Sequence, residues 1–435
     1  MLAIKCLSAS DADFNNKLVS LLARDMLVAE EVTSVVKDIL AQVRARGDEA
    51  VLEYTRKFDN LNVDSLAQLL VTKEQMQACL ERLPKSQLEA LKHAGERIRR
   101  YHERQKQTSW QYTEADGSIY GQKITALERA GIYVPGGKAN YPSSVLMMAI
   151  PAQVAGVKEI IATVPTPYTP AGDLVFAAAA LAGVDKLYTI GGAQAIAAMA
   201  YGTESISKVD KITGPGNVYV TAAKKQVFGE VGIDMVAGPS ELTIVCDGQT
   251  DPDWIAMDLF SQAEHDEQAQ SILISPDKAF LDRVAASIEK LLPNMNRRDI
   301  ITASLQGRGI FIHVQDLDEA AAVSNIIAPE HLELSVEDPD ALLSAIDSAG
   351  AIFMGRHSAE ALGDYCAGPS HVLPTSGTAR FFSALGVYDF QKRSSIINCS
   401  IEGANSLAVT AAELARNEHL QAHALSADYR LKKSV

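Results

Sequence analysis

The sequence predicts an α/β protein with two incomplete, Rossmann-like parallel-sheet domains and helical segments at both ends of the chain. Its 435 residues are too many for one compact core. From about residue 130, short β-branched runs alternate with Ala-rich helical segments, as in parallel sheets covered by helices. Aromatic residues make up only 6% of the chain, which favours helices packed on sheets over an all-β sandwich.

The N-terminal region has a helical hydrophobic period. Apolar residues recur at helical spacing from Val32 to Val43 and form one stripe. A second helical run is expected over residues 73–104. We therefore predict a helical N-terminal segment over residues 1–104, followed by a linker over residues 105–129 that packs on the second α/β domain.

The first α/β domain is predicted over residues 130–238. Strands are expected at residues 131–134, 160–164, 187–190 and 211–213, with helices at 143–154, 173–182 and 193–201. Glycine-rich turns join strands to helices, so the pattern predicts one parallel sheet.

The second α/β domain is predicted over residues 239–380. Its expected strands are residues 242–246, 271–275, 310–313 and 351–354, and its expected helices are 253–264, 278–292, 317–327 and 341–348. Residues 381–435 are predicted to be a helical tail, with a helix from about 406 to 431. This tail is too short to hold a core alone, so we expect it to pack on another domain or subunit.

Charge and cysteine usage restrict the partners and the compartment. The net charge of −14 disfavours binding to nucleic acid or to anionic membranes. The basic run at residues 97–106 is interpreted as the solvated face of a helix. The five cysteines form no C-x-x-C pair, and neither a signal peptide nor a membrane-spanning run is evident. A reducing, cytoplasmic location is therefore expected.

Three glycine-rich turns are candidates for binding a nucleotide. They are Pro135-Gly136-Gly137, Gly191-Gly192-Ala193-Gln194 and Gly214-Pro215-Gly216-Asn217. Glycine allows close approach to a phosphate, and a helix N-terminus offers unpaired N–H groups to an anion. None of the turns matches G-x-G-x-x-G, so ordinary strand-to-helix turns remain the alternative.

Candidate metal ligands are scattered along the chain. Gln262 and His265 lie three residues apart at the end of a predicted helix, so they share one face. Asp364 follows a glycine, and His423 lies on the C-terminal helix five residues after Glu418. Zinc binds imidazole and carboxylate readily and amide oxygen less often. Taken singly, each histidine is more often an ordinary surface or core residue than a metal ligand.

Adjacent Glu330 and His331, expected in a loop, could supply a carboxylate base and an imidazole base. Helix capping by Glu330 beside a solvated His331 is the alternative. His371 is a further loop histidine. A covalent route through Cys366 is disfavoured because no pattern that would activate its thiol is evident.

Taken together, these segments resemble the histidinol dehydrogenase family over nearly the whole chain. The matching segments are Arg46–Ala50, Gly131–Gly137, Gly191–Ala198, Gly214–Asn217, Ala237–Glu241, Ser261–His265, Pro329–Leu332, Gly363–Tyr365, His371–Thr375 and Phe390–Arg393. So many matches in the same order make the resemblance specific.

The resemblance implies an NAD-dependent oxidation of L-histidinol through L-histidinal to L-histidine, which consumes two NAD⁺ per histidinol. It implies that residues 130–238 bind NAD, with contacts from Tyr133, Gln194 and Asn217. The implied zinc ligands are Gln262, His265, Asp364 and His423, which would also contact substrate. The other implied substrate contacts are Ser240, His331, His371 and Glu418.

The resemblance also implies that His331 and Glu330 are the catalytic bases and that residues 239–380 carry the metal and catalytic residues. His331 would take the alcohol proton, and Glu330 would activate water on the aldehyde. The C-terminal segment would reach the site of a partner subunit in a homodimer. Two alternatives are a dehydrogenase for another small primary alcohol and a zinc-stabilised binding protein without activity.

Overall fold

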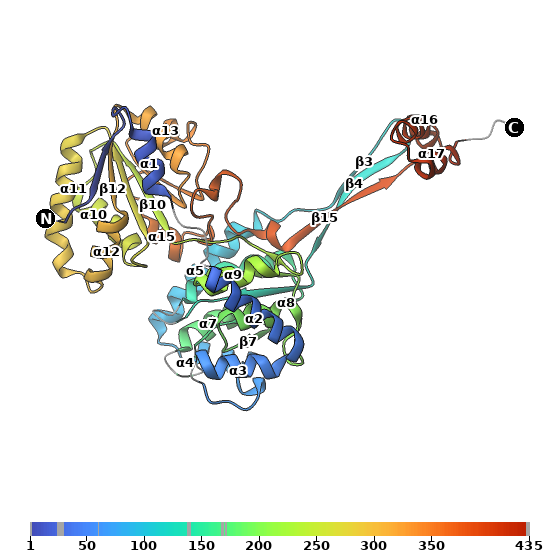
Figure 1. The fold of residues 1–435 in the computed structure, drawn as a ribbon, viewed down its shortest axis with the longest axis horizontal. Coiled ribbons are helices and arrows are strands. Elements are labelled where there is room, and N and C mark those ends of the chain that lie inside the picture. Colours follow the sequence, from blue (N-terminus) through green and yellow to red (C-terminus); the bar gives the residue numbers. More distant parts are fainter. Residues whose placement is uncertain are drawn as a thin grey trace.

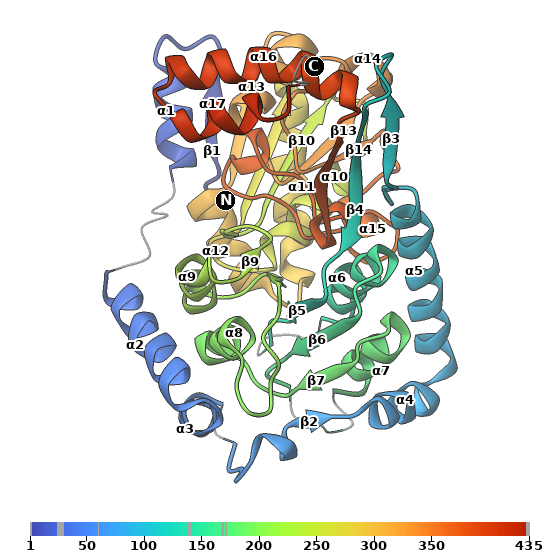
Figure 2. The ribbon, with the colours of Figure 1, turned by 90° about the vertical axis from the view of Figure 1, so that its right-hand side faces the viewer.

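The computed structural model describes residues 2–23, 30–59, 61–136, 141–166, 169 and 172–431. Two α/β domains lie side by side, and a long arm projects from them (Figure 1). Figure 2 looks along this arm, with both domains behind it. None of the helices in the described ranges is long and apolar enough to cross a membrane.

The first domain is built on a six-stranded sheet of order β2-β7-β6-β5-β8-β9. Only β2 runs antiparallel to its neighbour. The strands are β2 (Leu70–Val71), β5 (Arg129–Tyr133), β6 (Glu159–Thr163), β7 (Lys186–Tyr188), β8 (Lys211–Thr213) and β9 (Gly232–Ile233).

Helices cover both faces of this sheet and bury two apolar cores. One core contains α2 (Glu30–Arg46), α3 (Asp48–Phe58), α8 (Gly192–Tyr201) and α9 (Val218–Val227). The other contains α4 (Lys73–Arg82), α5 (Lys85–Glu103), α6 (Pro142–Ala155) and α7 (Asp173–Ala182). Helix α6 is apolar on nearly all sides and correspondingly buried.

The second domain has a six-stranded, fully parallel sheet of order β1-β12-β11-β10-β13-β14. Its strands are β1 (Lys5–Ser8), β10 (Glu241–Cys246), β11 (Gln270–Ser275), β12 (Ile310–His313), β13 (His331–Ser335) and β14 (Ala351–Met354). One face packs on α1 (Phe14–Leu22), α13 (Leu317–Ile327) and α14 (Pro339–Leu343), and the other on α10 (Pro252–Ala263), α11 (Lys278–Leu291) and α12 (Arg298–Arg308).

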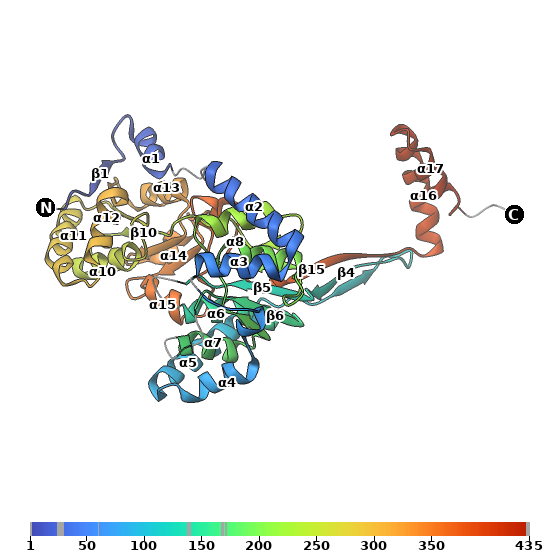
Figure 3. The same ribbon diagram turned by 60° about the horizontal axis from the view of Figure 1, so that its bottom comes forward.

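The arm is a three-stranded antiparallel sheet with two helices at its tip (Figure 3). It consists of β3 (Trp110–Thr113), β4 (Ile119–Ala126), β15 (Gln391–Asn398), α16 (Ile401–Asn417) and α17 (Gln421–Asp428). The packed apolar cluster at the tip is small and made of alanines, whereas Ile401, Val409 and Tyr429 are strongly exposed.

The predicted α/β class is confirmed, and elements such as β8, β12 and α13 have the expected bounds. Residues 1–104 differ from an all-helical segment, because β1 extends the second sheet and β2 the first. These edge strands span four and two residues, too few to show a strand period in the sequence.

The two regions that form the arm also differ from the prediction. Residues 105–129 were expected to be a linker on the second domain, but they supply β3 and β4. The expected helical tail begins with β15, which pairs with β4. The helix expected at 406–431 is divided at His419, whose φ of 60° cannot continue a right-handed helix. Helix α14 ends at Leu343, earlier than expected.

Candidate active site between the two domains

Glu330 and His331 lie at the amino edge of the second sheet. His331 is the first residue of β13, where it pairs with Leu242 of β10 and Ala351 of β14. It is therefore a strand residue, not the loop residue that was expected. Strand geometry fixes its backbone, since ladders on both sides hold it. Both side chains are buried, with exposed fractions of 5% for Glu330 and 4% for His331.

The Glu330 carboxylate has one clear donor. Its Oε2 accepts a hydrogen bond from the Glu241 N–H at 2.8 Å and lies 3.9 Å from His331 Nδ1. Burial raises the pKa of Glu330 to about 7, against the opposing effects of His331 and the Glu241 N–H. A carboxyl with this pKa can serve as a general base near neutral pH.

The imidazole of His331 lies among acidic groups. Its Nδ1 is 3.0 Å from the Glu241 carbonyl oxygen and 3.4 Å from Glu360 Oε1. Its Nε2 is 3.5 Å from Asp364 Oδ1. Burial alone would lower the pKa of His331, but the neighbouring carboxylates raise it well above its ordinary value. The surrounding carboxylates thus stabilise the protonated form of the ring.

His371 connects this cluster to the first domain. Its Nδ1 lies 2.8 Å from the Asp364 carbonyl oxygen, and its Nε2 lies 3.1 Å from Oγ of Ser144 on α6. Burial lowers the pKa of His371. Since α6 follows β5, the carboxyl edge of the first sheet faces the cluster at the amino edge of the second sheet.

Asp364 lies on α15 (Glu360–Tyr365), and Gln262 and His265 lie at the end of α10 or just beyond it. The two helices contact each other. Burial would raise the pKa of Asp364, but its interactions with His331, His371 and His265 lower it. The structure therefore brings Gln262, His265 and Asp364 to the same region as His331.

Gln262 carries an independent indication of a ligand. Its side chain is fully buried, and neither its oxygen nor its nitrogen has a hydrogen-bond partner among the described residues. An unsatisfied buried amide costs about 1–3 kcal/mol. A cation bound between α10 and α15 would satisfy the oxygen. Together with the imidazole of His265 and the carboxylate of Asp364, this donor set fits zinc.

Glu360 belongs to the cluster and was missed in the sequence. It lies one helical turn before Asp364, and ligand atoms of His331, Glu360 and Asp364 come within 4.8 Å of one another, as in a possible metal-binding group. Burial raises the pKa of Glu360 well above its ordinary value, while the adjacent His331 acts in the opposite direction and favours the carboxylate. The i, i+4 spacing with Asp364 was the available signal, because such residues share one helix face.

The three proposed nucleotide contacts lie near the carboxyl edge of the first sheet. Tyr133 ends β5, and its hydroxyl accepts the Gly192 N–H at 3.1 Å. Burial raises the pKa of Tyr133 to about 12, so the hydroxyl stays protonated. Gln194, on the first turn of α8, is 1% exposed, and its Nε2 has no partner in the described part of the chain.

The helix N-termini at this edge have fewer free backbone N–H groups for binding a phosphate than we expected. Asn217 Oδ1 accepts hydrogen bonds from the N–H groups of Tyr219 and Val220, which caps α9. At α8, the Gly192 N–H donates a hydrogen bond to the Tyr133 hydroxyl. These N–H groups already have protein acceptors, unlike the free donors of a phosphate-binding turn. Gly137, from the first turn, lies outside the described residues.

Two predicted site residues, Glu418 and His423, are not brought to the cluster within one chain. They lie at the tip of the arm, far from both sheets (Figure 1). Ser240 precedes β10, and its carbonyl oxygen accepts the Gln270 N–H at 3.0 Å. Cys366 follows α15, and its carbonyl oxygen accepts a hydrogen bond from Arg97 Nε at 2.9 Å.

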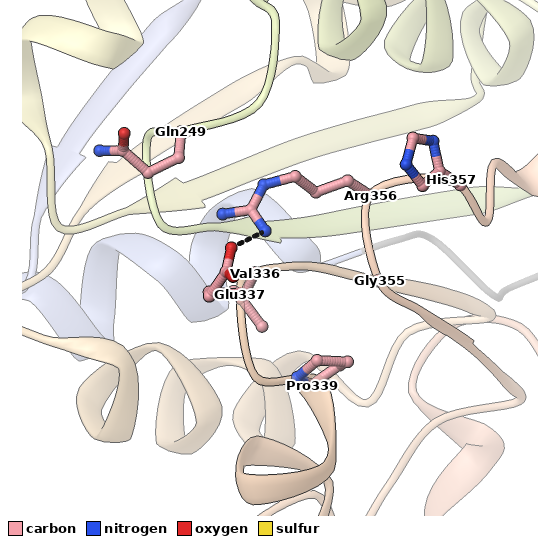
Figure 4. Close-up of a pocket in the computed structure, with 7 residues that line it drawn as sticks. All are labelled: Gln249, Val336, Glu337, Pro339, Gly355, Arg356 and His357. Carbon is pink, nitrogen blue, oxygen red and sulfur yellow. Dashed lines mark hydrogen bonds and ion pairs between the residues drawn. The ribbon is translucent and has the colours of Figure 1, made fainter.

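A cavity of about 590 Å³ lies at the opposite, carboxyl edge of the second sheet (Figure 4). Its lining residues are Gln249, Val336, Glu337, Pro339, Gly355, Arg356 and His357. The guanidinium of Arg356 donates hydrogen bonds to the carboxylates of Asp247 at 2.6 Å and Glu337 at 2.9 Å. The cavity is thus separate from the cluster around His331.

Comparisons with known proteins agree on one family. The family model described as histidinol dehydrogenase matches residues 22–431. The histidinol dehydrogenase of Pseudomonas aeruginosa is 64% identical over 429 residues, covering 99% of this chain and 98% of the relative. That of Dechloromonas aromatica is 60% identical over 432 residues, covering 99% of this chain and 100% of the relative.

A solved structure shows the same fold. The crystal structure of histidinol dehydrogenase from Elizabethkingia anophelis has a TM-score of 0.92 and 33% sequence identity, and the match covers 98% of each chain.

Proposed function

Because the chain belongs to the histidinol dehydrogenase family, we propose that it oxidises L-histidinol through L-histidinal to L-histidine, the last steps of histidine biosynthesis, with NAD as oxidant. The observation that carries this proposal is the buried pair Glu330 and His331. His331 contacts Asp364. His371, which also contacts Asp364, connects this cluster to Ser144 at the candidate nucleotide edge of the other domain. A site for a nucleotide, a cation and two bases is what this oxidation requires.

His331 acts as the base in alcohol oxidation. Its Nδ1 is directed at the Glu241 carbonyl oxygen, so in the neutral ring, the form that acts as a base, the proton lies on Nδ1 and the lone pair on Nε2. The substrate hydroxyl gives its proton to Nε2 as the carbinol carbon loses hydride to NAD. The products of this step are histidinal, NADH and one proton.

Glu330 acts in the second oxidation. Its carboxylate takes a proton from water as the water adds to the aldehyde carbon, and the protonated His331 returns its proton to the carbonyl oxygen, which gives the hydrated aldehyde and a neutral His331. His331 then takes a hydroxyl proton of this hydrate as the second hydride leaves. The position of the pair between the domains shields the reactive aldehyde from other nucleophiles.

Gln262, His265 and Asp364 are proposed as ligands of a zinc ion, with His423 of a partner subunit as the fourth. A zinc ion held there would orient the amine and imidazole of histidinol. Ser240, His371 and Glu418 are proposed as further substrate contacts. Glu418 would also come from the partner, and its negative charge suits a cationic amine.

Tyr133, Gln194 and Asn217 are proposed to contact NAD. The protonated hydroxyl of Tyr133 retains a donor, since the Gly192 N–H uses only a lone pair of its oxygen. The amide nitrogen of Asn217 is likewise not used in the cap, which engages only Oδ1. Polar contacts, instead of the helix N-termini, would then hold the dinucleotide.

A homodimer in which each arm completes the partner's site is also proposed. The exposed apolar residues Ile401, Val409 and Tyr429 support it, since the alanine cluster at the tip leaves them uncovered. The free cysteines fit the proposed cytoplasmic location.

The decisive experiment measures NADH formed per histidinol consumed. We expect two NADH and one histidine per histidinol, with low rates on a panel of other small primary alcohols. One NADH per histidinol would contradict the second oxidation. Negligible turnover of histidinol beside a good rate on another alcohol would contradict the substrate.

Removal of the metal provides a separate test. Dialysis against a chelator is expected to abolish turnover, and zinc is expected to restore it. Full activity in protein shown to be metal-free would contradict the role of Gln262, His265 and Asp364.

A further inference from the structure

Glu360 is a buried acid for which the reaction described above has no role. It is the first residue of α15 and is 1% exposed. Its backbone N–H donates to Glu333 Oε1 at 2.6 Å, which fixes the start of the helix. This bond anchors the backbone of Glu360 and leaves its carboxyl free for another partner.

That partner is the ring of His331. Glu360 Oε1 lies 3.4 Å from Nδ1, the nitrogen that also faces the Glu241 carbonyl oxygen. The carboxyl thus lies against Nδ1 of the ring, whereas Nε2 is the atom proposed to receive the substrate proton. Neither oxygen of Glu360 has a hydrogen-bond donor of good geometry among the described residues.

The burial of the Glu360 carboxyl without a hydrogen-bond donor among the described residues lowers the stability of the fold, which indicates that the carboxyl has a role in the site. A buried carboxyl without hydrogen-bond donors destabilises the fold, because nothing replaces its lost hydration. A buried negative charge is most stabilised when its immediate neighbour becomes positive. His331 becomes positive when it accepts a proton, and Glu360 lies against the ring at the nitrogen opposite the accepting one.

We propose that Glu360 is a positioning residue for the His331 base, an inference that rests on the proposed function. Its carboxylate holds the ring so that Nδ1–H points inward and Nε2 points to the substrate. When the hydroxyl proton moves to Nε2, the O–H bond breaks, an N–H bond forms, and Glu360 stabilises the resulting imidazolium. It acts in both oxidations, since His331 is the base in each.

The test is Glu360→Gln, which keeps the shape of the side chain and removes its charge. Loss of a group that orients a catalytic residue typically costs about 10- to 100-fold, and we expect a fall of that size in kcat for both histidinol and histidinal. The dissociation constant for histidinol, measured by calorimetry without NAD, is expected to change less than about threefold, because Glu360 acts on the base and not on binding. Zinc content is expected to be unchanged.

Two further variants make the result specific. Glu360→Asp keeps the negative charge, but its shorter side chain places the carboxylate farther from the His331 ring. We therefore expect an activity between that of Glu360→Gln and that of the wild type. Glu337→Gln is the matched control, since Glu337 is a glutamate that follows the carboxyl end of β13 and pairs with Arg356. It is expected to leave kcat unchanged. If Glu360→Gln does not fold, the kcat and histidinol affinity of Glu360→Asp decide in its place.

Three results would overturn the proposal. One is a kcat for Glu360→Gln within about threefold of wild type. Another is equal losses in kcat and histidinol affinity, which would indicate a substrate contact or a structural role. The third is an Asp variant no better than the Gln variant. Wild-type protein that forms no NADH from histidinol would instead refute the proposed function itself.

Discussion

The environment of Glu330 shows how a few atoms set the chemistry of a residue. Burial raises its pKa, while the single Glu241 N–H at 2.8 Å and the charge of His331 keep it from rising further. Burial alone would lower the pKa of the neighbouring His331, but the carboxylates around the ring raise it. Two adjacent residues therefore have distinct proton affinities, which suits them to distinct roles.

Replacement of Glu330 tests this division of roles. Glu330→Gln is expected to lower histidinal oxidation by about 100-fold or more, since a general base contributes about 10²–10⁴-fold, and to lower histidinol oxidation to histidinal much less. Stopped-flow measurement of NADH from each substrate separates the two steps. Equal losses on both substrates would refute the assignment.

The pKa of Glu330 also predicts a pH dependence. A carboxyl acts as a base only when ionised, so protonation of Glu330 should lower the rate of histidinal oxidation as pH falls below about 7, in addition to the effect of protonating His331, the other base of this step. An unshifted glutamate would place this change near the ordinary value of 4.5. Initial rates across this range, at saturating substrate, measure it. A flat profile between pH 5 and pH 8 would contradict the role of Glu330 as base.

At the scale of elements, a buried ion pair connects α9 to the turn after β8. Lys224 of α9 pairs with Asp234, and both side chains are almost fully buried. Lys224 Nζ also donates to the Gly214 carbonyl oxygen at 2.7 Å, and Asp234 accepts the Gly214 N–H at 2.7 Å. Gly214 has a φ of +122°, and a side chain there would collide with the Tyr133 carbonyl.

Removing one partner of this pair should therefore affect both stability and the proposed NAD site. Lys224→Met leaves an unpaired buried charge, and we expect a loss of about 3–5 kcal/mol in the free energy of unfolding. Because the pair fixes the turn that ends at Asn217, weaker NAD binding is also expected. Urea unfolding and titration with NAD measure the two effects. A loss below about 1 kcal/mol in the free energy of unfolding would show that the ion pair does not stabilise the fold as expected.

At the scale of the whole molecule, the arm separates two proposed site residues from the rest. Glu418 and His423 lie at its tip, while Gln262, His265 and Asp364 lie between the domains (Figure 1). Such an arrangement is complete only if an arm reaches another copy of the chain. Two-fold symmetry would give each protomer the arm of the other.

Mixed dimers test the sharing of sites. His423→Ala and His331→Ala chains are each expected to be inactive, because each lacks one residue of every site in its own homodimer. In the heterodimer, one of the two sites regains both residues, so activity should return. Purification with two different affinity tags verifies the heterodimer. Absence of rescue in verified heterodimers would argue for a site built within one chain.

Periodic elements could be predicted from the sequence, and short or paired ones could not. Strands such as β8 and β12 are flanked by helices with clear patterns, so their bounds were predictable. Strands β1 and β2 are edges that exist only because a sheet is present to pair with. The arm joins β4 to β15, which are hundreds of residues apart, and no local pattern contains that pairing.

The candidate site shows the same division. Its residue types were evident from motifs, but the i, i+4 spacing of Glu360 and Asp364 does not show the contact of Glu360 with His331, which depends on tertiary packing.

By itself, the sequence determined the α/β class, the order of most elements and the residue types available for chemistry, because periodicity and turn residues are local properties of the chain. Only the tertiary structure decided which side chains meet, which donors are already satisfied and how burial shifts each pKa. Those quantities depend on distances between segments and on exclusion of water, and both arise only when the two sheets and their helices pack together.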